Sequence, residues 1–395
     1  MDRRKFLKQS SLASGLFFVP SFVKAFENIA TAKLGYKRLV IIQLSGGNDG
    51  LNTIIPHNND IYYNARPQLA INKDIIKLND ELGFHPSLKP LRPLFDNGEL
   101  SIINNVGYPN PVRSHFRSMD IWHTASNANE YLQTGWLGRY LDKQGKNPYN
   151  AIETDEQLSL AMKGEHFNGI ATNDYKVLYR TARDPYFKNV INHYNDAHLS
   201  EHNLGYLYQT MIEAKSSAKY IFETTKVSSS KQDYPKNNFA KQLKYVAQFI
   251  NSGLETKVFY TALGGFDTHA NQTNKQAQLL SEYAESVQAF VNDLKRENTF
   301  NDTLILTFSE FGRRVKQNAA NGTDHGAANN VFVIGKNLKQ AGFYNKLASL
   351  NNLDDNGDIK YEIDFRSVYA TILNNWMDVS TDGIISSNPK TLNFI

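Results

Sequence analysis

Short apolar runs alternate with longer amphipathic stretches along most of the chain. Five runs have the length and composition of buried strands, at residues 39–42, 100–106, 257–263, 303–308 and 330–334. Apolar residues recur every three or four positions over residues 273–295, which predicts a helix. A second helix is predicted over residues 365–377, with Asp364 as its N-cap. Strands that alternate with helices predict an α/β fold, with a parallel sheet sandwiched between helices.

The middle of the chain has a different pattern. Residues 153–236 are polar, rich in aromatic side chains and helical in periodicity, and they include a serine-rich stretch at 227–232. We interpret this segment as a helical cap inserted into one domain of residues 37–395, with the serine-rich stretch as a surface loop.

The first 25 residues are typical of a targeting segment. Arg3 and Arg4 are followed by Phe6, Leu7 and Lys8, and residues 9–23 carry no charge. The apolar part, residues 12–19, is far shorter than the roughly 20 residues of a membrane-spanning helix. This pattern predicts a twin-arginine signal peptide over residues 1–25, the alternative being a disordered basic N-terminus. It predicts the twin-arginine export machinery as a partner and a periplasmic or secreted location, with no transmembrane segment elsewhere.

Composition excludes several classes of function. Five of the 43 basic residues and one of the 39 acidic residues lie in residues 1–25, so the remainder carries 38 of each sign. This balance gives no reason to expect nucleic-acid binding. The chain has no cysteine, which excludes disulfides, thiolate metal sites and a cysteine nucleophile.

Polar clusters follow the predicted strands, where the carboxyl ends of parallel strands would collect them. Carboxylates and imidazoles in these clusters predict a site for a divalent metal, with Zn, Mn, Mg or Ca as candidates and one or two ions bound. The candidate ligands are Asp49, Asp267, His269, Glu310, Asp324 and His325. The alternative for the glycine-rich cluster around Asp49 is a plain strand-to-helix turn. Residues 352–363 resemble a calcium loop but end in Ile363 where a glutamate is required, which favours a turn.

One cluster carries a candidate nucleophile. Ser114 is adjacent to His115 and lies between Arg113 and Arg117. A serine in this setting suits attack on a tetrahedral oxyanion ester, because the arginines would neutralise the anion. The alternative is that both arginines pair with surface carboxylates. No G-x-S-x-G elbow occurs, which counts against an α/β-hydrolase.

These clusters, in this order, resemble a known bacterial exported family. The segments LSGGNDGLNT, GYPNPVRSHFRSMDIW, GWLGRYLD, GGFDTHANQ, LTFSEFGRR, GTDHGAAN and DFRSVYATIL are similar to domain-of-unknown-function family 1501, which is placed in the alkaline phosphatase/sulfatase-like superfamily. The resemblance covers about residues 37–376. It implies a mixed, mostly parallel sheet between helices, with metals at its carboxyl edge.

The same resemblance implies roles for individual residues. Asp49 would bind the metal nearest the nucleophile, Ser114. Asp267 and His269 would be a ligand pair, and His325 with Asp324 the late histidine ligand. Glu310 stands where the superfamily has the aspartate of an Asp-His dyad, and Phe311 occupies the place of its histidine. One metal site is therefore expected to be incomplete, or rebuilt with Asp324 or His115.

Two functions from different classes follow. The leading hypothesis is an exported metal-dependent hydrolase of phosphate esters, with a small-molecule or glycan ester as substrate and Ser114 as nucleophile. Sulfate esters are disfavoured because Ser114 lacks the Cys/Ser-x-Pro-x-Arg context of sulfatases. The alternative is a non-catalytic exported protein that binds an anionic glycan or an envelope partner on the same fold.

Overall fold

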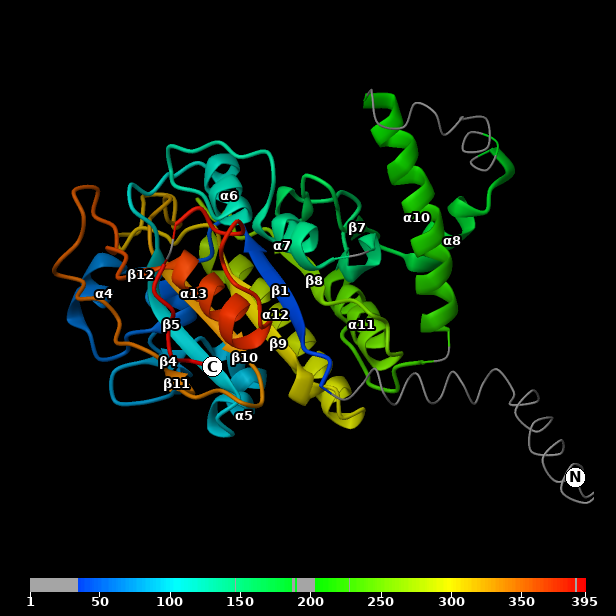
Figure 1. The fold of residues 1–395 in the computed structure, drawn as a ribbon. Helices are drawn as coiled ribbons and strands as arrows, with labels where there is room; N and C mark the ends of the chain where they lie inside the picture. Colours follow the sequence, from blue (N-terminus) through cyan, green and yellow to red (C-terminus); the bar gives the residue numbers. More distant parts are fainter. Residues whose placement is uncertain (1–34, 146, 187–188, 190–202, 227, 388) are drawn as a thin grey trace, which may run out of the picture.

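The computed structural model describes residues 35–145, 147–186, 189, 203–226, 228–387 and 389–395 (Figure 1). The predicted signal peptide, residues 1–25, lies outside the described residues. Within the described residues, no helix is both long enough and apolar enough to span a membrane.

One large sheet forms the centre of the molecule. In the described part of the chain it has nine strands, eight of them in the order β11-β5-β10-β9-β1-β8-β6-β7, and the ninth, β12, pairs with β5. The bounds are β1 Arg38–Ser45, β5 Leu100–Gly107, β6 Ala151–Glu153, β7 Ile170–Ala171, β8 Val258–Gly264, β9 Thr303–Phe308, β10 Asn329–Ile334, β11 Gly342–Phe343 and β12 Ile363–Asp364. All five predicted strands are present. A small second sheet contains β2 Ile54–Ile55, β4 Gly83–Phe84 and β3 Ile76–Lys77.

The central sheet is mostly parallel. Strand β1 pairs in parallel with both β8 and β9, and β10 is antiparallel to β9 and β5. The carboxyl ends of β1, β8 and β9 therefore meet at one edge. Because β10 runs the opposite way, the residues that precede it reach the same edge. This arrangement collects the polar clusters of four separate segments.

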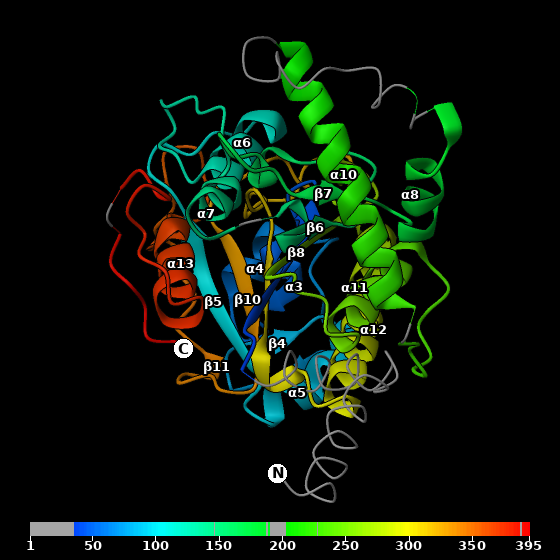
Figure 2. The same cartoon turned by 45° about the vertical axis from the view of Figure 1, so that its right-hand side comes forward.

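Helices cover both faces of the sheet, as the sequence predicts (Figure 2). One face packs against α11 (Asn238–Asn251) and α12 (Gln272–Arg296), with the shorter α5 (Arg92–Asp96). The other face packs against α6 (His115–Thr124), α7 (Trp136–Gln144) and α13 (Phe365–Thr371). The remaining helices of the described residues are α3 Gly50–Thr53, α4 Asp60–Ala65, α8 Tyr175–Ala182 and α10 Asn203–Thr225, with 3-10 turns at Pro86–Leu91, Pro148–Asn150, Leu160–Met162 and Phe300–Asp302.

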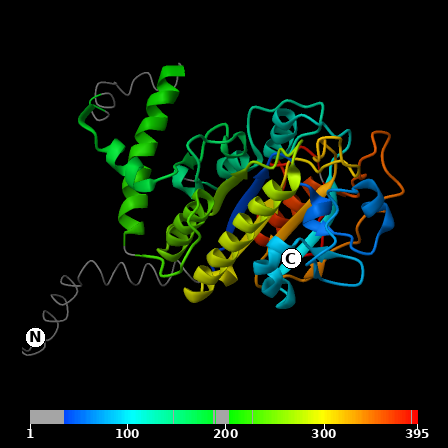
Figure 3. The ribbon, with the colours of Figure 1, turned by 180° about the vertical axis from the view of Figure 1, so that it is seen from behind.

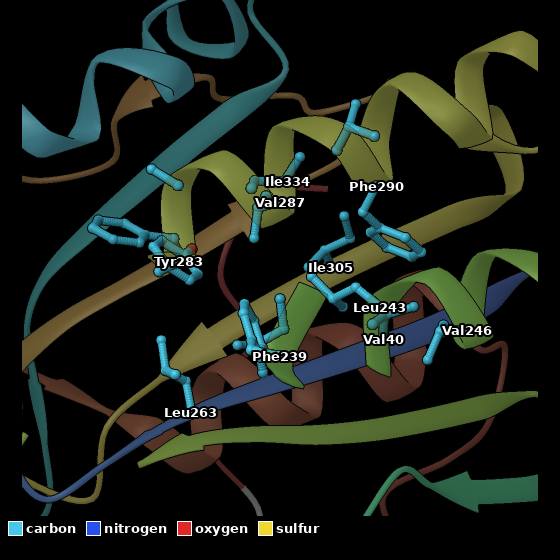
Figure 4. Close-up of a cluster of buried hydrophobic side chains, with 14 of the residues drawn as sticks. Val40, Phe239, Leu243, Val246, Leu263, Tyr283, Val287, Phe290, Ile305 and Ile334 are labelled. Atoms are coloured by element: carbon cyan, nitrogen blue, oxygen red, sulfur yellow. The ribbon is translucent and has the colours of Figure 1, made fainter. Parts of the chain in front are cut away.

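Strand β1 shows why the sheet is buried on both sides. Val40 packs into the core shared with α11 and α12 (Figure 4), and so does Ile42. Leu39 and Ile41 pack into the core on the opposite face. All four side chains are almost completely buried. Complete burial of such a side chain contributes about 1.5–3 kcal/mol, so a continuous apolar run is required where both faces are covered.

The predicted helix over residues 273–295 is α12, which crosses the back of the sheet (Figure 3). The predicted helix over residues 365–377 is also present, and Asp364 caps it by accepting a hydrogen bond from the backbone N–H of Arg366. Its last turn differs, because Ile372–Trp376 is a π-helical turn. In this turn the indole of Trp376 donates a hydrogen bond to the carbonyl of Arg38.

The segment predicted as a helical insertion, residues 153–236, is helical only in part. Strands β6 and β7 pair with each other, and β6 pairs with β8, so the beginning of the segment extends the central sheet. Helices α8 and α10 form the helical part and stand at one side of the body (Figures 1 and 3). They pack through Tyr179 and Phe222, whose parallel rings lie 4.0 Å apart. A two-residue strand such as β7 is too short to produce an alternating pattern in the sequence.

Candidate metal centre

Two glycines allow the loops after β1 and β8 to pack together. Gly46 and Gly47 both have positive φ, at +117° and +68°. A Cβ on Gly46 would lie 2.4 Å from the backbone nitrogen of Asp267, and one on Gly47 would lie 2.3 Å from the ring of Phe311. Only glycine tolerates both the conformation and the contact. These glycines therefore bring the backbone of β1 against the residues that form the site.

Four side chains converge at the sheet edge. Asp267 and His269 follow β8, His325 precedes β10, and His115 is the first residue of α6. The Oδ1 atom of Asp267 lies 3.3 Å from Nε2 of His115, 3.1 Å from Nε2 of His269 and 3.2 Å from Nε2 of His325. The two Nε2 atoms of His269 and His325 are 2.9 Å apart. We call these four residues the His/Asp cluster.

Each histidine of the cluster is oriented through its other ring nitrogen. The Nδ1 atom of His115 is 2.8 Å from Oε1 of Glu310, and that of His269 is 3.3 Å from Oδ1 of Asp324. The Nδ1 atom of His325 is 2.8 Å from the backbone carbonyl of Arg113. Since all three partners are acceptors, we assign the proton of each neutral ring to Nδ1. Each Nε2 then presents a lone pair to the centre of the cluster.

The positions of these side chains are better explained by a cation bound between them than by contacts among the side chains alone. Two Nε2 lone pairs at 2.9 Å repel each other, and Nε2 of His115 is buried without a hydrogen-bond partner. The ligand atoms of His115, Asp267 and His325 all lie within 4.8 Å of one another. Imidazole nitrogens with one carboxylate are a donor set that zinc and similar divalent metals prefer, and Nδ1 bonded to a carboxylate or carbonyl is usual for metal-binding histidines.

Arg313 fixes the position of Asp267. Its guanidinium is fully buried and donates hydrogen bonds to the carbonyls of Gly46, Gly47 and Thr323 as well as to Oδ1 of Asp267 at 2.8 Å. Burial raises the pKa of Asp267, but the hydrogen bond and the positive charge of Arg313 outweigh this effect, and the net pKa lies well below the usual range. Asp267 is therefore ionised at any pH relevant to metal binding.

The histidines of the cluster differ in their electrostatic environment. The hydrogen bond to Glu310 raises the pKa of His115, whereas burial lowers the pKa of His325. The buried ring of Phe311 lies 4.8 Å from that of His115 and 4.7 Å from that of His325. In the position where the family resemblance implies a histidine, this protein therefore has an apolar wall behind two candidate ligands.

Two predicted ligands lie outside the cluster and contact its histidines. Glu310 is completely buried, and its Oε1 accepts hydrogen bonds from the backbone N–H of Gly46 and from His115. Asp324 accepts from His269 and from the side-chain amide of Asn318. The structure therefore places both carboxylates where they orient histidines. His115, which the sequence marks both as the neighbour of the candidate nucleophile and as a residue that could rebuild a metal site, stands among the candidate ligands.

The structure does not bring Asp49 into the His/Asp cluster. Its Oδ2 accepts hydrogen bonds from Arg66 at 2.6 Å and from Gln272 at 2.5 Å, and its Oδ1 caps α3 by accepting from the N–H of Asn52. Asp49 and Arg66 are both fully buried. Both carboxylate oxygens of Asp49 are therefore held by protein donors, and no histidine of the cluster is among these donors.

The candidate nucleophile is exposed, whereas the two arginines that flank it are engaged within the protein. Ser114 is exposed at the N-cap of α6, immediately before His115. The guanidinium of Arg113 pairs with Asp354 at 2.9 Å and with Asp358, and that of Arg117 bonds the carbonyls of residues 127, 128 and 130. Both arginines are therefore engaged within the protein. Asp354 lies in the predicted turn of residues 352–363, where the guanidinium of Arg113 takes the place of a cation.

Sequence reasoning missed a buried polar network at the last turn of α6. His123 is bonded through Nε2 to the hydroxyl of Tyr260 at 3.0 Å, and this hydroxyl donates to Gln43 at 2.5 Å. Burial lowers the pKa of His123 to about 4, and it raises the pKa of nearby Glu153 to about 7. These residues belong to none of the motifs, so nothing in the sequence marks them.

A search of curated proteins found no match. Similar solved structures include the periplasmic domain of EptC from Escherichia coli in complex with Zn (11% identity, 88% of this chain and 83% of that chain, TM-score 0.40) and the lipoteichoic acid synthase LtaP from Listeria monocytogenes (11%, 92% and 82%, TM-score 0.43). A protein in the alkaline phosphatase superfamily from Vibrio parahaemolyticus is also similar (12%, 81% and 70%, TM-score 0.34).

The sequence itself decides the family. The family described as Protein of unknown function (DUF1501) matches residues 36–383, which include the loops after β1, β8 and β9, the start of α6 and the residues before β10. All four residues of the His/Asp cluster lie inside the matched region. The chain therefore belongs to the DUF1501 family.

Proposed function

We propose that this protein is an exported metal-dependent hydrolase of phosphate esters. The observation that carries the proposal is the convergence of three histidine Nε2 atoms on Asp267, each histidine being held through Nδ1 by a separate acceptor. The proposed ligands of one divalent ion are His115, Asp267, His269 and His325. A metal bound there would supply Lewis acidity to a phosphoryl oxygen and to the attacking oxygen.

The residues around the cluster have separate proposed roles. Ser114 is the proposed nucleophile, because it is exposed directly beside His115. It lies at the N-terminus of α6, where the positive end of the helix dipole favours an anionic substrate. Arg113 and Arg117 are engaged with carboxylates and carbonyls, so we assign them to positioning. Arg113 orients His325 through its carbonyl, and Arg117 holds the loop after α6.

The substrate class follows from the proposed nucleophile. Ser114 is followed by His115, Phe116 and Arg117, and this context lacks the proline and arginine at the positions that sulfatase maturation requires. We therefore propose phosphate esters in preference to sulfate esters. Export through the twin-arginine pathway, proposed from Arg3 and Arg4, is consistent with a protein that folds around its metal before it leaves the cytoplasm.

A hydrolysis screen with matched variants tests the proposal. Purified mature protein, loaded in turn with Zn, Mn, Mg and Ca, would be assayed on p-nitrophenyl phosphate, bis-p-nitrophenyl phosphate and p-nitrophenyl sulfate. We expect metal-dependent cleavage of at least one phosphate ester, lowered by about two orders of magnitude or more in Ser114→Ala and in His115→Ala. His166→Ala is the control, because His166 is exposed and lies outside the cluster.

Two outcomes would count against the proposal in different ways. Full activity in Ser114→Ala would exclude the serine as nucleophile but keep the metal-dependent reaction. Folded, metal-loaded protein that cleaves none of the esters would overturn the hydrolase assignment. That second outcome would favour the alternative function, a non-catalytic binding protein on the same fold.

A further inference from the structure

A groove is lined by residues of α8 and α10 and by Arg183, which directly follows α8. These two helices stand beside the sheet (Figure 1). The volume of the groove is about 640 Å³, inside the range of about 300–1,000 Å³ for small-ligand pockets. Tyr179 lines it from α8, and Ile212, Lys215 and Lys219 line it from α10. It shares no residue with the His/Asp cluster.

The lining of the groove is cationic. Arg183, Lys215 and Lys219 face one acidic residue, Glu223. Among the described residues, neither Lys215 nor Lys219 forms an ion pair within 4.0 Å. These two lysines are four positions apart on one helix, so they lie on the same face, and like charges at this spacing destabilise a helix. Glu223, four positions after Lys219, offsets part of this repulsion, and an anion bound between the two helices would offset the rest.

An aromatic surface accompanies these charges. The ring of Tyr179 stacks on that of Phe222 at 4.0 Å, which fixes its orientation in the wall of the groove. The guanidinium of Arg183 lies 5.4 Å from the centre of the Tyr179 ring, and its Nη1 donates to the Tyr179 hydroxyl at 3.4 Å. Arg183 is therefore held as a preorganised cation beside an aromatic face. Ala182 and Ile212 add an aliphatic surface.

We propose that this groove binds an acidic oligosaccharide, with sulfate, phosphate or carboxylate groups on its sugar units. The ammonium and guanidinium groups would bind the anionic substituents, and the Tyr179 ring and the aliphatic side chains would contact the apolar faces of the sugars. A concave groove between two helices suits a narrow chain and not a flat membrane surface. This site is independent of the proposed hydrolase activity and persists if that activity is absent.

Binding of defined oligosaccharides to the full mature protein tests the inference. Titration calorimetry would use a sulfated hexasaccharide, its desulfated counterpart as a neutral probe, and vesicles of anionic phospholipid. We expect saturable binding of the sulfated probe that weakens as salt concentration rises, with no binding of the neutral probe. The double variant Lys215→Ala/Lys219→Ala should bind at least tenfold more weakly.

The controls separate this site from other anion sites. Lys73→Ala/Lys89→Ala removes two exposed lysines elsewhere and should leave affinity unchanged, and so should His325→Ala in the His/Asp cluster. Alanine favours helices, so the double variant in α10 should keep its fold, which circular dichroism would check. Absence of binding in the wild type, equal binding by the α10 variant, or binding to vesicles but not to the hexasaccharide would overturn the proposal.

Discussion

Glu310 accepts a hydrogen bond from Nδ1 of His115 at 2.8 Å, although the two residues are 195 positions apart in the chain. The contact joins the loop after β9 to the first turn of α6. It fixes which nitrogen of His115 carries the proton, and it directs Nε2 toward Asp267. His269 and His325 are oriented in the same way, with Asp324 and the carbonyl of Arg113 as the respective acceptors.

Replacement of Glu310 by glutamine tests this orienting role. The Glu310→Gln side chain keeps an oxygen acceptor for the N–H of Gly46 but loses the negative charge opposite His115. We expect the affinity for the metal to fall about 10–100-fold, because the partners of ligand histidines typically have effects of this size. Asp324→Asn should have a smaller effect, since Asp324 is half exposed and water can replace its contact with His269. Competition with a chromophoric chelator would measure both affinities, and an unchanged affinity in Glu310→Gln would contradict the role.

The buried pair of Asp49 and Arg66 should contribute to stability and not to metal binding. Asp49→Asn leaves the guanidinium of Arg66 buried without a counter-charge, which costs about 3–5 kcal/mol. We expect this loss in the free energy of unfolding measured with urea, with metal content per chain unchanged. The matched control is Asp96→Asn, which breaks an exposed pair with Arg92 and should cost less than about 1 kcal/mol. Loss of metal from a folded Asp49→Asn protein would show that Asp49 is a ligand after all.

Glu153 should make stability depend on pH. Its pKa is raised by burial from 4.5 to about 7, so the folded protein holds this proton more tightly than the unfolded chain. The resulting stabilisation is complete below about pH 4.5 and is lost as the pH rises to about 7, a change of about 3 kcal/mol at most. Glu153→Gln retains an acceptor for the N–H of Ser159 and removes the titration. As the pH rises from about 4.5 to about 7, the wild type should therefore lose stability relative to Glu153→Gln. A difference in unfolding free energy that stays constant over this range would contradict the prediction.

The sheet and its helices could be predicted because their signals are local. The continuous apolar run of β1 reflects burial on both faces, and the three-to-four spacing in α12 reflects burial on one. Strand β7 and the π-helical turn at Ile372–Trp376 could not be predicted. The first is too short to show a period, and the second depends on packing against distant residues such as Arg38.

The candidate site was predictable in its location but not in its detailed roles. Carboxylates and histidines after successive strands indicate a shared edge, which is where the structure brings Asp267, His269 and His325 together. A carboxylate can point to the centre of the cluster, or it can orient a histidine from outside. Which of the two occurs depends on tertiary contacts, which the spacing of residues along the sequence does not encode. Asp49 faces Arg66, which lies 17 positions away, and Glu310 faces His115 from the far half of the chain.

The metal content of the natively exported protein tests the central claim most directly. Elemental analysis should find one divalent ion per folded chain in the wild type and in the control His166→Ala. We expect that ion to be lost in both His115→Ala and His325→Ala, with circular dichroism unchanged. A wild-type protein that is folded yet metal-free after incubation with Zn, Mn, Mg and Ca, or a His115→Ala variant that keeps the full complement, would contradict a metal centre built on these histidines.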